Sequence, residues 1–381
     1  MAVIRDTDRN AHKFFQLVQD TPRVDDLSLI VVMHLVPWTR IFFEHLERLA
    51  RIAVVLPKPK SQDDEEHAYF RNKYTLKPLN RASFQDPDHV LQLVEQAVPS
   101  GRFVIMDIGG YFAPHIEMLS LETSRRLLGV VEDTENGHRR YAALNSYPVP
   151  VVSVARSELK NSEDFLVGQS IVFAAERLMR DFGSIMSGRK ATVIGYGKIG
   201  RSIAQHLHNK HLSTVIVESN PIRAIEAKAH GFHVIPKIEA ITRGNLVFCA
   251  TGNKCISGDE FERLNNGSYV ISVTSVDDEL DLSSARATFQ VEQVSQHIEH
   301  FSRMGHFFYL LANGNAVNFA IDDRGRLGPF IFPVQAELLV AARYLATTSS
   351  KLPKKLITLP EELKVDIAAK WEKAYATVNA P

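Results

Sequence analysis

The chain has 381 residues, 45% of them hydrophobic and 23% charged, and because single hydrophobic cores stop growing at roughly 250 to 300 residues, this length predicts two domains. The 44 basic and 44 acidic side chains balance, which argues against nucleic acid or a membrane as a partner and favours a small molecule or another copy of the chain. The two cysteines and the charged N-terminal residues exclude a disulfide framework and a signal-peptide pattern, so we expect a soluble, cytoplasmic protein.

Short apolar segments alternate with helical patterns in the first part of the chain. In order they are 29–33, 39–51, 52–56, 89–98 and 103–106, the second and fourth being helical. This alternation predicts a parallel sheet with helices on both faces. A longer amphipathic pattern at 162–180 predicts a helix, and the glycines and serines of 183–188 predict a domain boundary after it.

The same alternation begins again after this boundary. Strands are predicted at 191–194, 214–217, 233–235, 246–248 and 269–271, and helices at 199–207, at 333–345 and in the charged C-terminal residues. The sequence therefore predicts an α/β protein with two doubly wound parallel-sheet domains.

A glycine-rich turn, Gly195-Tyr196-Gly197-Lys198-Ile199-Gly200, directly follows the strand at 191–194 and opens the next helix. In this context Gly195 can make the tight turn, Gly197 can admit a pyrophosphate to the backbone, and Gly200 can let helix and strand pack closely. The N-terminus of the helix would then turn its unpaired N–H groups toward the phosphates. We expect the second domain to be a Rossmann domain that binds NAD through this loop; the alternative is a glycine turn that binds no nucleotide.

Two further segments follow strands of the same predicted sheet. Glu218 lies about 20 residues beyond the loop, where a carboxylate binds ribose hydroxyls and repels a 2'-phosphate, which favours NAD over NADP. Thr251, Gly252 and Asn253 form a turn after the strand at 246–248, and open α/β sheets bind ligands along this edge. The alternatives are a solvated acid and a plain strand-to-helix turn.

The order of several motifs resembles the S-adenosylhomocysteine hydrolase family, from about Leu29 to about Tyr344. The matching stretches are 132–138 (EDTENGH), 160–164 (KNSED), the glycine loop with 218–221 (ESNP), and 311–318. The resemblance implies a substrate and catalytic domain at 1–183, a Rossmann NAD-binding domain at 184–328, and C-terminal helices at 329–381 that return to the first domain and to a subunit interface. It also implies a homodimer or homotetramer.

The reaction of that family implies a retained NAD that oxidises the 3'-hydroxyl of a nucleoside-type substrate. The ketone acidifies the C4' proton and lets the 5' substituent leave, after which water adds and the ketone is reduced again. Oxidation of an alcohol requires a base, and Lys160 matches the family's catalytic lysine. Asp164 accompanies it one helical turn on, although an exposed ion pair is the alternative for these two. His34 matches a histidine near the 5' end, and Asp133 stands where the family has a glutamate.

The resemblance also assigns contacts with the cofactor. Thr134 matches the first of three threonines near the nicotinamide, and the next two positions differ. Asn318 matches an asparagine that binds the nicotinamide carboxamide. The full set of expected NAD contacts is Gly195, Gly197, Lys198, Ile199, Gly200, Glu218, Asn220, Thr134, Thr251, Asn253 and Asn318.

Other positions depart from the family. Ile108 replaces an aspartate that handles protons near C4' and C5', and Ser275 replaces a histidine near the 3' position. Phe165 and Gln169 replace an asparagine and a cysteine. The glycine-histidine-proline motif is absent from 324–330, and the family's long C-terminal tail has no match. These departures predict an altered substrate or a truncated reaction cycle.

The sequence leaves two other functions open. One is a catalytically weak NAD-binding regulatory protein of the same fold, and the other is an NAD-dependent dehydrogenase of another hydroxy substrate. His297 and His300, three residues apart, are predicted to share a helical face. No cysteine or glutamate pattern accompanies them, so we expect no metal site.

Overall fold

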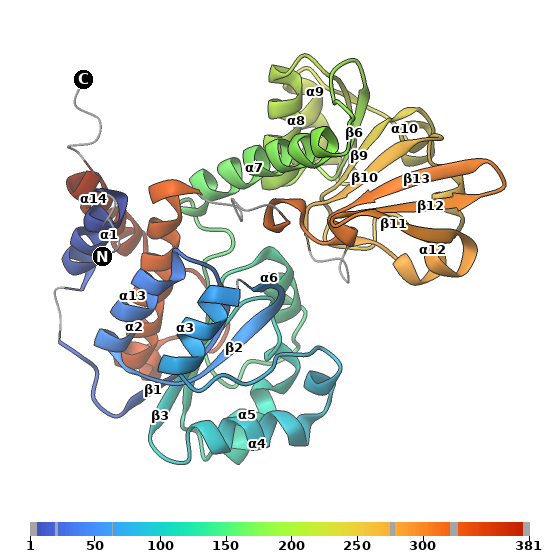
Figure 1. Cartoon of the computed structure of the whole chain (residues 1–381). Coiled ribbons are helices and arrows are strands. Elements are labelled where there is room, and N and C mark those ends of the chain that lie inside the picture. The colour runs from blue at the N-terminus through green and yellow to red at the C-terminus, as the bar shows by residue number, and fades with distance from the viewer. Residues whose placement is uncertain (1–5, 20–21, 63, 275–278, 321–326, 376–381) are drawn as a thin grey trace. The chain divides into compact units, whose positions relative to one another are not determined.

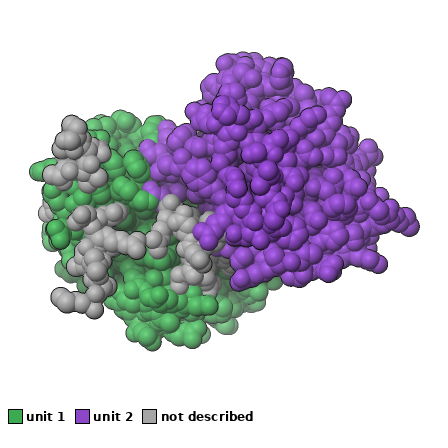
Figure 2. All heavy atoms as spheres, turned by 45° about the horizontal axis from the view of Figure 1, so that its top comes forward, with its two compact units in different colours: residues 1–160, 328–381 green, residues 161–327 purple. Residues whose placement is uncertain are grey.

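The chain forms two compact units. The computed structural model describes residues 6–19, 22–62, 64–274, 279–320 and 327–375. Unit 1 comprises Met1–Lys160 and Gly328–Pro381, and unit 2 comprises Asn161–Leu327 (Figure 2). Each unit has its own hydrophobic core between a sheet and the helices that cover it (Figure 1), which is the usual layering of α/β proteins.

Unit 1 is built on a parallel sheet with the strand order β14-β5-β4-β3-β1-β2. β1 reads LSLIVVMHL, and all of its residues but His34 are buried, as expected for a strand covered on both faces. Its strands are β1 (Leu27–Leu35), β2 (Arg51–Gln62), β3 (Arg102–Asp107), β4 (Leu127–Glu132), β5 (Val151–Ser153) and β14 (Leu356–Ile357). Its helices are α1 (Asp6–Val18), α2 (Thr39–Leu49), α3 (Asp64–Lys73), α4 (Pro87–Ala97), α5 (Ile116–Glu122), α6 (Glu135–Ala142), α13 (Phe332–Thr348) and α14 (Glu361–Tyr375).

Unit 2 has the strand order β11-β12-β13-β10-β9-β6-β7-β8. The run from β13 to β8 is parallel, and its crossover between β6 and β9 is that of a Rossmann sheet. The strands are β6 (Lys190–Ile194), β7 (Ser213–Val217), β8 (His233–Val234), β9 (Leu246–Cys249), β10 (Ser268–Ser272), β11 (Gln290–Ser295), β12 (Ile298–Arg303) and β13 (His306–Leu311). The helices are α7 (Lys160–Asp181), α8 (Lys198–Asn209), α9 (Pro221–Ala229), α10 (Lys237–Arg243) and α12 (Leu282–Thr288). The predicted α/β fold class with a Rossmann domain is confirmed.

The boundary between the units differs from the predicted position at residue 183. It falls at Lys160, where α7 begins, so that nearly all of α7 belongs to unit 2. Ile171, Ala175 and Met179 of this helix are buried in the core of unit 2. The amphipathic pattern predicts the helix but not which of two cores receives its apolar face.

An antiparallel edge made of β11 and β12 was not predicted. Met304 and Gly305 have φ angles of 47° and 82°, which suit the tight two-residue turn between β12 and β13. His297 immediately precedes β12 and His300 lies within it, so the prediction of a shared helical face is wrong. Their spacing of three residues fits a helix, but the hairpin turn imposes a strand.

The segment Gly328–Lys351 is long and apolar enough, by length and composition, to cross a membrane. Most of it is buried, 67% of its most apolar window, and α13 within it packs against β3, β4 and α2. The apolar composition is therefore explained by a place in the core of unit 1.

Candidate active site

The carboxyl edge of the sheet in unit 1 gathers the residues predicted to act on a substrate. The chain crosses from β2 past β1 to β3, and ligands of open α/β sheets bind beside such a switch point. His34 lies near the end of β1, Asp133 directly follows β4, and Lys160 begins α7. Three separate strand ends and turns thus supply the candidate catalytic groups.

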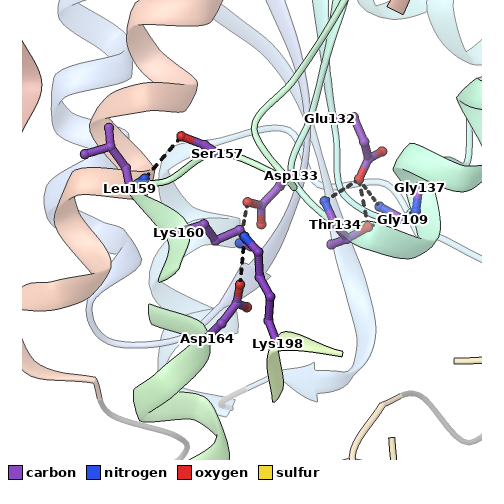
Figure 3. A network of polar contacts seen from close by, with 10 residues as sticks. All are labelled: Gly109, Glu132, Asp133, Thr134, Gly137, Ser157, Leu159, Lys160, Asp164 and Lys198. Atoms are coloured by element: carbon purple, nitrogen blue, oxygen red, sulfur yellow. Dashed lines mark hydrogen bonds and ion pairs between the residues drawn. The ribbon is translucent and has the colours of Figure 1, made fainter. Parts of the chain in front are cut away.

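Lys160 and Asp133 form an ion pair at this edge (Figure 3). Lys160 Nζ lies 2.9 Å from Asp133 Oδ1, and the two side chains are 9% and 16% exposed. A charge-assisted hydrogen bond with so little exposure to water holds the amine in one position. Asp164 lies one turn further along α7, in unit 2, where its Oδ2 is 3.5 Å from Lys198 Nζ.

His34 is kept neutral by its surroundings, above all by burial. Burial, the positive charge of Lys58 and that of Lys160 lower the pKa of His34 to about 3, and the negative charge of Asp133 opposes them. A neutral imidazole can donate one hydrogen bond and accept another. His34 can therefore hold or pass a proton at physiological pH without being charged itself.

We expect substitution of His34 by asparagine to make the stability of the protein less sensitive to acid. The folded-state pKa of His34 is lowered to about 3 from 6.5, so between these values the unfolded chain binds a proton that the folded chain does not, and stability falls as the pH falls. Between pH 7 and pH 4 the free energy of unfolding should fall by about 1–3 kcal/mol less in the variant than in the unchanged protein. Urea unfolding at both pH values measures this, with His233→Asn on an exposed strand as the control; equal acid sensitivity of the two variants would contradict the assignment.

Glu132 is a site residue that the sequence analysis missed. Its Oε1 accepts hydrogen bonds from Gly109 N at 3.1 Å and Thr134 N at 2.7 Å (Figure 3). Its Oε2 accepts one from Gly110 N at 2.9 Å. Burial and the neighbouring Asp107 raise its pKa. A side chain on Gly137 would overlap this carboxyl group, so the carboxyl group, the loop after β3 and the start of α6 form one rigid block.

Thr134, predicted to contact the nicotinamide, serves this same block. Its Oγ1 donates to Glu132 Oε1 at 2.7 Å and accepts from Gly137 N at 3.1 Å. It is therefore the N-cap of α6, which satisfies a backbone donor at the start of a helix. The sequence carries a signal for this role, because a threonine directly before an acidic residue, here Glu135, is typical of the start of a helix.

Ile108 stands where the family has an acid, and it is buried. A cation lies beside this position instead. Lys58 Nζ donates a hydrogen bond to the carbonyl oxygen of Ile108 at 3.1 Å. Ser275, the other departure near the substrate, lies outside the described residues. This edge of unit 1 therefore differs in charge from the one that the resemblance implies.

The glycine loop of unit 2 has the geometry that a dinucleotide requires. Gly195 has a φ of 99°, and a Cβ there would lie 2.6 Å from the carbonyl oxygen of Ala250. A Cβ on Gly200 would overlap the carbonyl oxygen of Gly195. A Cβ on Gly197 would meet only Arg223, at 3.8 Å, so the backbone beside α8 is open at this position, where a pyrophosphate approaches in Rossmann domains. Lys198 and Ile199 form the first turn of α8.

Glu218 lies at the end of β7, beside this loop. Its Oε2 accepts from Tyr196 N and its Oε1 from Asn220 N, both at 2.7 Å. The carboxylate is thereby fixed next to the loop while its remaining lone pairs can accept hydroxyl groups. Asn220 is exposed and caps α9 through Ile222 N at 2.9 Å.

The turn after β9 is held by Glu279, a fully buried acid that the sequence analysis missed. Its Oε1 accepts from Thr251 N at 2.8 Å and its Oε2 from Gly252 N at 2.6 Å. The hydroxyl groups of Thr251 and Thr274 also donate to it. Asn253 is exposed, and its N–H donates to Thr251 Oγ1 at 3.0 Å.

We expect Glu279→Gln to destabilise the protein by about 2–3 kcal/mol, because an amide NH₂ would replace an oxygen that accepts two hydrogen bonds and would leave buried donors without an acceptor. Urea unfolding measures the loss. Glu239→Gln, which alters an i,i+4 ion pair with Arg243 that is largely exposed, should change stability by less than about 0.5 kcal/mol. Equal effects of the two substitutions would show that Glu279 does not hold this turn.

Asn318 is 96% buried in the short helix Val317–Phe319 of unit 2. Among the described residues its Oδ1 has no hydrogen-bond partner. A buried amide oxygen without a partner is costly, and a bound carboxamide would supply the missing donor. The open backbone at Gly197, the carboxylate of Glu218 and this orphaned oxygen fit NAD.

No cluster of three or more His, Cys, Asp or Glu side chains that could hold a metal ion is found in the described part of the chain. His297 directly precedes β12 and His300 lies within it, and both side chains are partly buried. His300 instead packs against the ring of Tyr309 on β13, with ring centroids 5.2 Å apart.

Comparisons with known proteins point to one family of enzymes. Residues 166–323 match the S-adenosyl-L-homocysteine hydrolase, NAD binding domain. An adenosylhomocysteinase of Sulfolobus acidocaldarius is 26% identical over 91% of this chain and 83% of its own length. The chain is thus similar to the S-adenosylhomocysteine hydrolase family over most of its length, as a divergent relative.

Two more relatives show how these enzymes vary. An adenosylhomocysteinase of Pyrococcus abyssi is 28% identical over 84% of this chain and 76% of its own length. An S-inosyl-L-homocysteine hydrolase of Methanopyrus kandleri is 25% identical over 79% of this chain and 72% of its own length. The two names differ in the nucleoside. The cofactor of the chain is NAD, and the matched region contains the glycine loop, Glu218 and Asn318.

Proposed function

We propose that this chain is an enzyme of the S-adenosylhomocysteine hydrolase type that oxidises the 3'-hydroxyl of a nucleoside-type substrate with NAD, which prepares the substrate for elimination and hydration at C5'. Unit 1 binds the substrate and unit 2 binds NAD. The observation that carries the proposal is the Lys160–Asp133 ion pair, nearly buried at the carboxyl edge of the sheet in unit 1. If Lys160 served only to stabilise the fold, it would not need to lie nearly buried near the neutral His34 at an edge where such sheets bind ligands.

The residues of unit 1 divide the proton chemistry between them. NAD, when bound, accepts a hydride from the carbon that bears the hydroxyl group and returns it at the end of the cycle. Lys160 takes the hydroxyl proton as the hydride leaves. Asp133 holds the amine in place and stabilises its ammonium form. His34, kept neutral by burial and by two lysines, hydrogen-bonds at the 5' end.

The second half of the cycle rests on different groups from those implied by the resemblance. Lys58 contacts the backbone at Ile108, where the family has an acid. We therefore propose that the 5' substituent of the substrate differs from homocysteine or that the cycle is shortened. Protein carrying NAD, incubated with S-adenosylhomocysteine or S-inosylhomocysteine, tests this: release of thiol supports the full cycle, and reduction of bound NAD without thiol release supports a cycle that stops at oxidation.

We also propose that the enzyme is a homodimer or homotetramer in the cytoplasm. The basis is the family alone, whose members use subunit contacts near the C-terminus. Light scattering on the purified protein decides the oligomeric state, and the mass of a single chain would contradict the proposal.

A further inference from the structure

Glu337 is an acid in the middle of an apolar helix. It lies in α13 with 1% of its surface exposed, and its neighbours Leu338, Leu339 and Ala341 are buried hydrophobic residues. Its Oε2 has no hydrogen-bond partner among the described residues. Burying a carboxyl group in such a place is costly unless other groups compensate. The position therefore demands a reason other than packing.

The carboxyl group of Glu337 faces the turn that precedes the catalytic lysine. It forms a side-chain hydrogen bond with Ser157, which is itself buried. Ser157 in turn accepts from Leu159 N at 3.3 Å through its Oγ, and from Lys160 N at 3.3 Å through its carbonyl oxygen. Glu337 thus contacts the residue on which the start of α7 is built.

Three charged groups face Glu337 from the elements around it. They are Lys160 at the start of α7, Asp133 after β4, and Lys364 in α14. Lys364 Nζ already lies 2.5 Å from Glu158 Oε2 and 2.6 Å from Glu361 Oε2. Lys364 therefore has carboxylate partners of its own, as Lys160 has in Asp133, but the charge of Lys160 acts on Glu337 more strongly than that of Lys364.

The protonation of Glu337 changes within the physiological range. Burial raises its pKa to about 7, opposed by the hydrogen bond from Ser157 and by the two lysines. The carboxyl group is neutral below this pH and adds a negative charge beside Lys160 above it. A negative charge close to an amine in a nearly buried site favours the ammonium form.

We propose that Glu337 is a positioning residue for Lys160, which holds the turn at Ser157 and sets how readily the Lys160 amine gives up its proton. The effect of Glu337 on the charge of Lys160 is independent of the proposed function, and only the resulting effect on catalysis rests on it. Lys160 accepts the substrate proton as a free amine, so a protonated Glu337 favours the active form and an ionised Glu337 opposes it.

The test compares the holoenzyme with Glu337→Gln, which stays neutral at every pH and keeps an oxygen that can accept from Ser157. Lysines labelled with ¹³C at Cε report by NMR the pH at which Lys160 loses its proton, and Lys160→Met identifies the signal. We expect this midpoint to fall by about one pH unit in Glu337→Gln, a tenfold change in proton affinity. The exposed Glu372→Gln on α14 is the control, and an unchanged midpoint in folded Glu337→Gln would overturn the proposal.

Two further measurements separate positioning from catalysis. Ser157→Ala breaks the link to the turn but leaves Glu337 able to ionise, so it should lower the rate of NAD reduction and shift its pH dependence by less than Glu337→Gln does; a shift as large as in Glu337→Gln would overturn the division of roles. If no nucleoside reduces the bound NAD, the proposed function fails, but the NMR titration needs no substrate and still decides whether Glu337 sets the charge of Lys160.

Discussion

Replacing Lys160 with methionine is expected to lower the rate at which a nucleoside reduces the bound NAD by about 10²–10⁴-fold, the usual contribution of a general base. Methionine keeps the volume of the side chain but cannot accept a proton. Binding of NAD to unit 2 should not change, because the glycine loop and Glu218 are in the other unit. Rapid mixing of the holoenzyme with adenosine, followed by absorbance of the reduced nicotinamide, measures the rate.

The control for this substitution is Lys370→Met, which removes an i,i+4 ion pair with Asp366 on α14. It should react at the rate of the unchanged protein. Asp133 loses its partner in Lys160→Met, so urea unfolding must show that the variant is folded before the rates are compared. A folded Lys160→Met variant that keeps the full rate would remove Lys160 from the mechanism.

Gly197→Ala is expected to weaken the binding of NAD by about 100-fold, or ~2.7 kcal/mol, while the protein stays folded. Gly197 has φ −72° and ψ −170°, which alanine can adopt, and its Cβ would meet only Arg223 within the protein. The added methyl group would instead occupy the space through which a pyrophosphate approaches the backbone. The NAD retained on purification and the affinity of the stripped protein measure the effect.

Two further substitutions separate the cofactor from the fold. Gly200→Ala places a methyl group on the carbonyl oxygen of Gly195, so it should lower both stability and NAD binding. Ser213→Ala, at the exposed start of β7, should change neither. If Gly197→Ala bound NAD as tightly as Ser213→Ala, the loop would not be the phosphate site.

The fold could be predicted where the pattern is local. The strand at 29–33 lies within β1, and the helix at 162–180 lies within α7, because both are long and strongly patterned. The hairpin of β12 and β13 was missed, since its turn depends on two left-handed residues, Met304 and Gly305. The placement of α7 in unit 2 depends on tertiary packing, which a periodic pattern does not contain.

The candidate site could be predicted in part. Lys160, His34 and Asp133 were expected because motifs in a fixed order carry them, and in the structure both Lys160 and Asp133 act on the pKa of His34. Glu279 and Glu337 were not, because each acts on residues far away in the sequence: Glu279 on Thr251, 28 residues earlier, and Glu337 on Ser157. A lone acid within an apolar helix was the available signal for Glu337.

Retained NAD is expected to oxidise a nucleoside bound in unit 1. The most direct test is to add adenosine to the purified holoenzyme without added NAD and to follow the absorbance of reduced nicotinamide. We expect a rise that reaches no more than one equivalent per chain and that Lys160→Met lacks. Absence of a rise with adenosine and inosine, together with repeated turnover of added NAD by a 2-hydroxy acid, would contradict this function.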